Sequence, residues 1–228
     1  MSNVFLLPNL LVLVRHGEDE RTGNENHTTC HYRLTKRGKK QAIKVGKWLK
    51  KNRYSFDKYF CSYYIRTQEM CRIIYPHIEP IEDARIIEVR RGMEEFVPRK
   101  KAEKVTPWNK RVKESVARYH RPPLNGDSLA DKEKDLRNFW LTLQIECANQ
   151  DVVVFGHGKT VPVWGKILQG WTIERTMEEY ERNSPEFASI TVYRRKGDSM
   201  VLELDNFAPW KKAKKKRDRK KEKEKKKK

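Results

Sequence analysis

The sequence predicts an α/β fold, a three-layer sandwich in which helices flank a mainly parallel central sheet. Leu11–Val14 and Asp151–Phe155 are apolar runs of strand length, and each leads closely into a His-Gly pair. Segments with helical spacing alternate with such runs, as expected where helices connect parallel strands. Because open α/β sheets bind ligands at the carboxyl ends of their strands, the two His-Gly pairs need a joint explanation.

The first half of the chain is predicted to continue with two helices and a strand. Thr35 is an N-cap candidate for a helix whose apolar residues recur every three or four positions. Residues 56–61 form a short apolar-aromatic run that predicts the second strand. Ser62 is expected to begin the next helix, which carries Arg66 in its first turns and stops at Pro76. An anion is the natural ligand near such a helix start.

The second half is predicted to contain an excursion from the sheet, two helices flanking the second His-Gly strand, and a hairpin. The excursion covers residues 98–125 and is expected to contain one helix around 108–119. The two helices are predicted over 129–147 and 159–169. The two strands of the hairpin are predicted over 187–194 and 200–207. Gly126-Asp127-Ser128 is expected to cap the first of these helices. Pro162 suits the first turn of the second.

Composition favours one substantial domain followed by a charged tail. The 228 residues are 37% hydrophobic, and we assign residues 1–210 to one domain. Residues 211–228 contain fourteen Lys/Arg, three Asp/Glu and no apolar residue larger than alanine, so they are predicted to be a disordered polybasic tail. This tail carries +11 of the total net charge of +20, which leaves +9 on residues 1–210.

Cysteine spacing and hydropathy indicate an intracellular chain. The four cysteines include no pair at the two-residue spacing of zinc and redox motifs. The apolar run over residues 5–14 is broken by Pro8 and is too short to span a bilayer. We therefore expect no transmembrane segment, reduced thiols, and a cytoplasmic or nuclear location. Cys61 and Cys71 are interpreted as small buried hydrophobes.

The residues at the strand ends suit phosphoryl transfer, which needs positive charge, a nucleophile and an acid. His16 can attack phosphorus through a neutral ring nitrogen. Arg15 and Arg66 can grip phosphate oxygens with forked donors, and His157 can supply a further donor. Glu88 can protonate the leaving oxygen and later activate water. This scheme requires no metal, and we predict no cofactor.

Several motifs resemble those of the histidine phosphatase superfamily and occur in the same order as in that family, which includes the cofactor-dependent phosphoglycerate mutases. They are Arg15-His16-Gly17-Glu18, Leu34-Thr35 through Ala42, Ser62 through Glu69, Glu88 with Gly92, Gly126-Asp127-Ser128, and Val154 through Gly158. The resemblance spans roughly residues 9–207 and implies a phosphoglycerate mutase-like catalytic domain. It implies that His16 is the nucleophile, Glu88 the proton donor, and Arg15, Arg66 and His157 the phosphate pocket.

The sequence departs from this family at informative positions. Asp19 stands where the family usually has Ser or Thr. The family's phosphate-contacting Asn, six residues after the nucleophile, is Thr22 here, and we expect Asn24 to supply the contact from a longer loop. Val89 occupies the place of the mutases' arginine after the acid, which favours a phosphatase over a mutase.

The sequence therefore predicts a metal-independent phosphatase that works through a phosphohistidine. Five basic residues follow the acid, and their positive charge favours a polyanionic substrate, either a small molecule or a phosphoprotein. They are Arg90, Arg91, Arg99, Lys100 and Lys101. Two alternatives stay open. One is a catalytically weak module for phosphate recognition or nucleic-acid association, and the other is a mutase-type phosphotransferase.

The polybasic tail over 211–228 predicts further partners. Its charge suits RNA, DNA or an anionic membrane surface, bound through phosphate groups. The tail is equally compatible with a nuclear localisation signal or with a segment that only keeps the protein in solution. Base stacking has little support because Trp210 is the one aromatic residue nearby.

Overall fold

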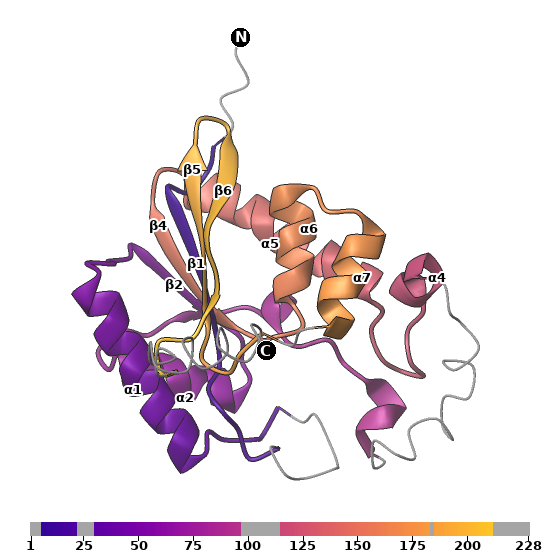
Figure 1. The fold of residues 1–228 in the computed structure, drawn as a ribbon, viewed down its shortest axis with the longest axis horizontal. Helices are drawn as coiled ribbons and strands as arrows, with labels where there is room; N and C mark the ends of the chain where they lie inside the picture. Colours follow the sequence, from indigo (N-terminus) through magenta and orange to yellow (C-terminus); the bar gives the residue numbers. More distant parts are fainter. Residues whose placement is uncertain (1–5, 22–29, 97–114, 183–184, 212–228) are drawn as a thin grey trace, which may run out of the picture.

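The computed structural model describes residues 6–21, 30–96, 115–182 and 185–211, and it is built on one six-stranded sheet (Figure 1). The strands are β1 (Leu10–Arg15), β2 (Lys58–Cys61), β3 (Ile81–Glu82), β4 (Asp151–Gly156), β5 (Ile190–Lys196) and β6 (Ser199–Phe207). Their order is β3-β2-β4-β1-β5-β6, in which the first four are parallel and the hairpin β5-β6 is joined antiparallel to β1. The predicted mainly parallel sheet is confirmed.

Helices cover both faces of this sheet. They are α1 (Lys36–Lys51), α2 (Ile65–Ile74), α4 (Ser115–His120), α5 (Leu129–Glu146), α6 (Val161–Gln169) and α7 (Ile173–Arg182), with short 3₁₀ helices η1 (Ala84–Ile86) and η2 (Gly92–Phe96). Figure 1 shows α1 and α2 on one side of the sheet and α5, α6 and α7 on the other. Each side has its own apolar core. The predicted three-layer α/β sandwich is therefore confirmed.

The first strand is apolar up to its last residue, Arg15, because both of its faces are covered. All six residues of β1 are buried. Leu11 and Leu13 face the core beneath α5 and α6, whereas Leu10, Val12 and Val14 face the core beneath α1 and α2. β4 lies beside β1 and is buried in the same way. This double burial holds the end of β1, and hence His16, in a fixed position.

Several helix starts follow the local signals in the sequence. The Thr35 hydroxyl accepts a hydrogen bond from the N–H of Gly38 at 3.0 Å and caps α1. Ser128 and Asp131 form a capping box at the start of α5. Pro162 lies in the first turn of α6, where its missing N–H costs nothing. These three predictions are confirmed.

Two features differ from the expectation. The helix predicted to begin at Ser62 begins at Ile65, because the N–H of Ser62 still bonds to the Phe155 carbonyl and extends the β2-β4 ladder. Helix α7 was not predicted: its apolar residues Ile173, Met177 and Tyr180 have helical spacing but are surrounded by charged side chains. It packs against α4 and α6.

The remaining predictions concern buried side chains, the 98–125 excursion, the tail and the absence of a transmembrane segment. Trp164, Cys61 and Cys71 are buried, as predicted, whereas Trp48 and Trp140 are only partly buried. Of the 98–125 excursion, residues 98–114 lie outside the described part, as does the tail beyond Lys211. No helix within the described ranges has the length and hydropathy to cross a membrane.

Candidate active site

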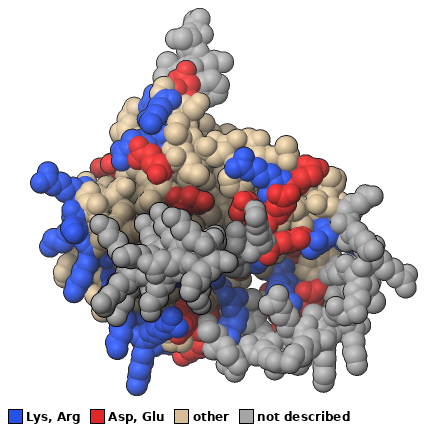
Figure 2. Space-filling model, in the orientation of Figure 1, with Lys and Arg blue, Asp and Glu red and all other residues tan. Residues whose placement is uncertain are grey.

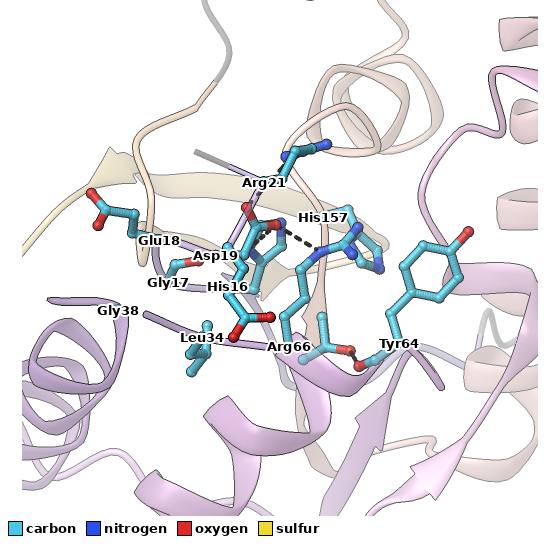
Figure 3. A network of polar contacts seen from close by, with 12 residues as sticks. His16, Gly17, Glu18, Asp19, Arg21, Leu34, Gly38, Tyr64, Arg66 and His157 are labelled. Carbon is cyan, nitrogen blue, oxygen red and sulfur yellow. Dashed lines mark hydrogen bonds and ion pairs between the residues drawn. The ribbon is translucent and has the colours of Figure 1, made fainter. Parts of the chain in front are cut away.

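The candidate site lies where β1 and β4 end side by side. These strands pair in parallel with Arg15 opposite Gly156, so the residues that follow each strand emerge at one edge. The His16 and His157 side chains are each 1% exposed, and their ring centroids are 5.3 Å apart. Figure 3 shows both rings beside the Arg66 guanidinium. The structure thus brings the two His-Gly pairs together at one place.

His16 has the protonation state that a nucleophile needs. Its Nδ1 donates a hydrogen bond of 2.8 Å to the carbonyl of Gly17, because a carbonyl can only accept. Nε2 therefore keeps its lone pair, and it is buried with no hydrogen-bond partner among the described residues. Burial, with help from the charges of Arg66 and Arg15, lowers the pKa of His16 well below its usual value. The ring is neutral at physiological pH.

His157 is held as the opposite tautomer. Arg66 Nη2 lies 3.3 Å from His157 Nδ1, and a guanidinium only donates, so Nδ1 accepts. Its Nε2–H then donates to the Ser62 hydroxyl, 2.9 Å away. Burial and the charge of Arg66 lower the pKa of His157 well below the usual value. This ring is also neutral, and Ser62 and Arg66 fix its orientation.

Arg15 and Arg66 place two buried guanidinium groups beside the histidines. The guanidinium carbon of Arg15 lies 4.3 Å from the ring centre of Phe187, and that of Arg66 lies 4.7 Å from the ring centre of Tyr64. Burial lowers the pKa of Arg15 to about 10, so this group stays protonated at neutral pH. Burial also lowers the pKa of Arg66. Two desolvated cations at one strand edge form a strong site for an anion.

Asp19 also belongs to this pocket, although it is not among the site residues predicted from the sequence. Its carboxylate is fully buried, 3.3 Å from Nε of Arg66 and 3.9 Å from Nδ1 of His16. Nε of Arg21 lies 3.7 Å away on another side, as Figure 3 shows. The signal in the sequence was an acid at a position where the family carries a neutral hydroxyl. This carboxylate competes with any bound anion for Arg66.

Replacing Asp19 with serine is expected to strengthen inhibition by inorganic phosphate about tenfold, because the variant removes a negative charge next to Arg66. The measurement is the inhibition constant of phosphate against turnover of an aryl phosphate. Asp83→Ser is the matched control, since Asp83 also pairs with an arginine, Arg85, but outside the pocket. Unchanged or weaker inhibition in Asp19→Ser would show that the carboxylate does not oppose phosphate.

Glu88 reaches the pocket from the segment after η1. It is 5% exposed, and one carboxylate oxygen accepts a hydrogen bond of 3.1 Å from the N–H of Val89. Burial lowers the pKa of Arg15, and the nearby Glu88 carboxylate opposes that shift. The structure thus places the acid predicted from sequence within electrostatic reach of Arg15, the arginine predicted to bind phosphate.

Gly158 leaves room for the Arg15 side chain. A Cβ atom at this position would lie 2.8 Å from Nε of Arg15, so a side chain would push the guanidinium aside. Gly158→Ala is therefore expected to lower kcat/KM for a phosphate ester roughly tenfold to a hundredfold, as for other small displacements of a positioned group.

The matched control for this prediction is Gly156→Ala, two residues earlier. A Cβ there meets its first neighbour only at 3.9 Å, so the site should tolerate it. Steady-state kinetics of both variants give the comparison. Equal kcat/KM values for the two would show that the position of Arg15 does not limit turnover.

The buried neutral histidines make stability sensitive to mild acid. Burial holds the folded-state pKa of His16 and His157 well below the unfolded value of about 6.5. As the pH falls below 6.5, the unfolded chain takes up protons that the folded chain does not, so stability is lost. Each histidine should reduce the free energy of unfolding by about 2 kcal/mol between pH 7 and pH 5.

Urea denaturation at the two pH values tests this expectation. The double variant His16→Asn/His157→Asn should lose about 4 kcal/mol less than the wild type, because the carboxylates contribute equally to both. The same loss in both proteins would mean that the histidines are protonated in the folded state.

Other predicted site residues are either outside the described part or engaged elsewhere. Asn24 lies within residues 22–29, and Arg99, Lys100 and Lys101 lie within 97–114, which the structure does not describe. Arg90 pairs with Asp127 at 2.6 Å and Arg91 with Glu94 at 3.2 Å, so both have acidic neighbours. Among the described residues, no three His, Cys, Asp or Glu side chains are grouped to hold a metal ion.

The fold and the pocket define an α/β protein with buried arginines and histidines gathered at the edge of its sheet, an arrangement that suits a phosphate group. The chain belongs to the histidine phosphatase superfamily (branch 1), whose family model matches residues 11–207. The family resemblance seen in the sequence motifs is confirmed.

Relatives and solved structures include both mutases and phosphatases. The phosphoglycerate mutase of Schizosaccharomyces pombe is 30% identical over 181 residues, which cover 72% of this chain and 82% of that protein. The alpha-ribazole phosphatase from Shigella flexneri has a TM-score of 0.74 at 19% identity, covering 87% of this chain and 96% of that one. A mycobacterial glucosyl-3-phosphoglycerate phosphatase in complex with VO3 also has a TM-score of 0.74, at 16% identity, covering 87% and 98%. These structures confirm the phosphoglycerate mutase-like fold.

Proposed function

We propose that the chain hydrolyses a phosphate monoester through a phosphohistidine formed on Nε2 of His16. The observation that carries this proposal is the lone pair on that nitrogen, buried in the pocket of Arg15 and Arg66. The bond from Nδ1 to Gly17 fixes the tautomer. A module that only binds phosphate has no need of a nucleophile held in this state.

In the first step, the Nε2 lone pair of His16 attacks phosphorus while the bond to the leaving oxygen breaks. Glu88 in its protonated form gives its proton to that oxygen, and the alcohol departs. Arg15 and Arg66 stabilise the charge on the phosphoryl oxygens. The ring becomes positively charged when the P–N bond forms, and the Gly17 carbonyl and the Asp19 carboxylate lie next to its Nδ1–H.

In the second step, the Glu88 carboxylate takes a proton from water, whose oxygen attacks phosphorus. The P–N bond breaks, its electron pair returns to Nε2, and inorganic phosphate leaves. Glu88 is again protonated, so the cycle is complete. The arginines supply all the positive charge that these steps need, and the proposed reaction is therefore metal-independent.

Val89 supports hydrolysis over mutase-type transfer. The mutases of this family carry an arginine directly after the acid, and here that position is an apolar residue that is 7% exposed. A buried valine cannot bind the second anionic group of a phosphoglycerate. The names of the relatives include mutases, so the phosphotransferase remains the alternative reaction.

Asp19 favours a second candidate, a catalytically weak module for phosphate recognition. Its carboxylate holds part of the charge of Arg66 and reduces the charge offered to a substrate. One experiment separates the two functions: turnover of an aryl phosphate in the presence of EDTA by the wild type and by His16→Ala. Turnover that depends on His16 supports the enzyme. No turnover of any phosphate ester would favour the module, and activity retained in the variant would exclude His16 as nucleophile.

The proposed substrate carries negative charge beyond the transferred phosphate. Arg21 supports this, because its side chain is 25% exposed and stands at the pocket next to Asp19. Arg90 and Arg91 contribute less to the attraction of such a substrate, because each of them pairs with an acidic neighbour. If a monoester with no charge beyond its phosphate were turned over as fast as a bisphosphate at low salt, this would count against a polyanionic substrate.

A further inference from the structure

The positive charge of residues 1–210 is concentrated on one helix. Their net charge is +9, and α1 alone carries eight Lys/Arg with no Asp/Glu. The rest of this part of the chain is therefore close to neutral. Charge gathered on one element creates a local positive field that an evenly distributed net charge would not.

All eight basic residues of α1 are exposed. The opposite side of the helix is buried against the sheet through Gly38, Gln41, Ala42, Val45 and Leu49. We call the exposed side the basic face of α1; its residues are Lys36, Arg37, Lys39, Lys40, Lys44, Lys47, Lys50 and Lys51. Figure 2 shows Lys and Arg projecting along the left side of the molecule, where α1 lies in Figure 1.

Most of this charge has no acidic partner. Arg37 pairs with Glu18 at 3.0 Å, and Lys39 lies 4.0 Å from Glu69. The other six lysines of the basic face form no ion pair with any residue that the structure describes. Six uncompensated cations on a rigid helix about 24 Å long are placed to meet a row of anions.

The tail begins next to the same face. The Arg37 guanidinium lies 5.5 Å from the ring centre of Trp210, whose indole N–H bonds to the Phe187 carbonyl. Lys211, the last described residue, pairs with Glu186. Trp210, the last residue before the polybasic sequence, thus lies beside the basic face of α1.

We propose that the basic face of α1 binds the phosphate backbone of duplex nucleic acid without reading its sequence. A duplex carries about one charge per 1.7 Å of its axis, so it offers each lysine a phosphate. Stacking of unpaired bases is not favoured, since the α1 aromatic residue Trp48 packs on Tyr54 and Phe207. Membrane insertion is not favoured either, because Ile43 is the single large apolar residue exposed on α1.

The test uses the full chain and a fluorescein-labelled 24-base-pair DNA duplex, with anisotropy measured between 50 and 200 mM salt. The variant Lys40→Gln/Lys44→Gln/Lys47→Gln/Lys51→Gln removes four charges from the basic face. Its matched control removes four exposed charges elsewhere: Arg121→Gln/Lys134→Gln/Arg175→Gln/Lys196→Gln. Vesicles of phosphatidylcholine and phosphatidylserine at 3:1 are tested in parallel.

The α1 variant should bind the duplex about tenfold or more weakly, and the slope of log K against log salt should fall by about 3 to 4. The control should change both far less. Equal losses in the two variants would overturn the proposal, since net charge or the tail alone would then account for binding. Tighter binding to the vesicles than to the duplex would overturn it in favour of a membrane surface.

A measurement of phosphatase activity distinguishes a failure of this proposal from a failure of the proposed function. None of the four substituted lysines touches the pocket, so both variants should turn over an aryl phosphate at the wild-type rate and melt at the wild-type temperature. If the fourfold variant unfolds, Lys40→Gln/Lys44→Gln and Lys47→Gln/Lys51→Gln are tested separately, each with an expected slope decrease of about 2. An unchanged slope in both pairs would overturn the proposal.

Discussion

Replacing His16 with asparagine is expected to lower kcat for an aryl phosphate by about 10⁴-fold or more, as for other enzymes that lose a nucleophile. Asparagine keeps a polar side chain of similar size but has no lone pair of comparable basicity for phosphorus. Arg15 and Arg66 remain in place, so the inhibition constant of inorganic phosphate should change only a few-fold. Steady-state kinetics with phosphate as inhibitor measure both quantities.

His77→Asn is the matched control, because His77 is exposed and lies outside the pocket. It should keep the wild-type kcat. If His16→Asn kept more than about a tenth of the activity, another group would have to be the nucleophile. If it lost phosphate binding as well, the loss of activity would reflect a damaged pocket.

Replacing Glu88 with glutamine should lower kcat by about 10²- to 10⁴-fold for alkyl phosphates, whose leaving oxygen needs a proton. The effect on an aryl phosphate should be much smaller in the first step, because a phenolate leaves without protonation. The measurement is the ratio of kcat/KM values for an alkyl and a nitrophenyl ester in wild type and variant, because kcat/KM reports the first step and not the attack of water that both esters share. Glutamine keeps the size of the side chain and removes only the proton transfer.

Glu82→Gln is the control for this prediction, since Glu82 lies close in sequence but is exposed and bonds to Gln68. It should leave the ratio unchanged. Equal losses of kcat/KM for both esters in Glu88→Gln would mean that Glu88 does not donate the proton to the leaving oxygen.

The sequence predicts the sheet well because its central strands have two covered faces. A strand such as β1 must then be apolar along nearly its whole length, which makes it visible as an uninterrupted apolar run that stops just before Arg15 and His16. The caps of α1 and α5 are equally visible, because Thr35 and Ser128 act on N–H groups only three residues away. These elements can be predicted from the sequence because each of their signals acts within a few residues of itself.

Contacts between distant segments could not be predicted in the same way. The burial of Asp19 between Arg66 and His16 depends on how α2, which packs against α1 and β4, brings Arg66 to the end of β1. Ser62 belongs to the strand ladder and holds His157, which shifts the start of α2 to Ile65. Helix α7 takes its place from packing against α4 and α6 more than from its own charged sequence.

The most direct test of the central claim is a search for the phosphohistidine itself. Full-length wild type is mixed with a ³²P-labelled phosphate ester, quenched in alkali within milliseconds and analysed for bound label. We expect label that survives alkali, is released by acid and maps to His16, with none on His16→Asn. Product formation with no such label, or label on another residue, would contradict it.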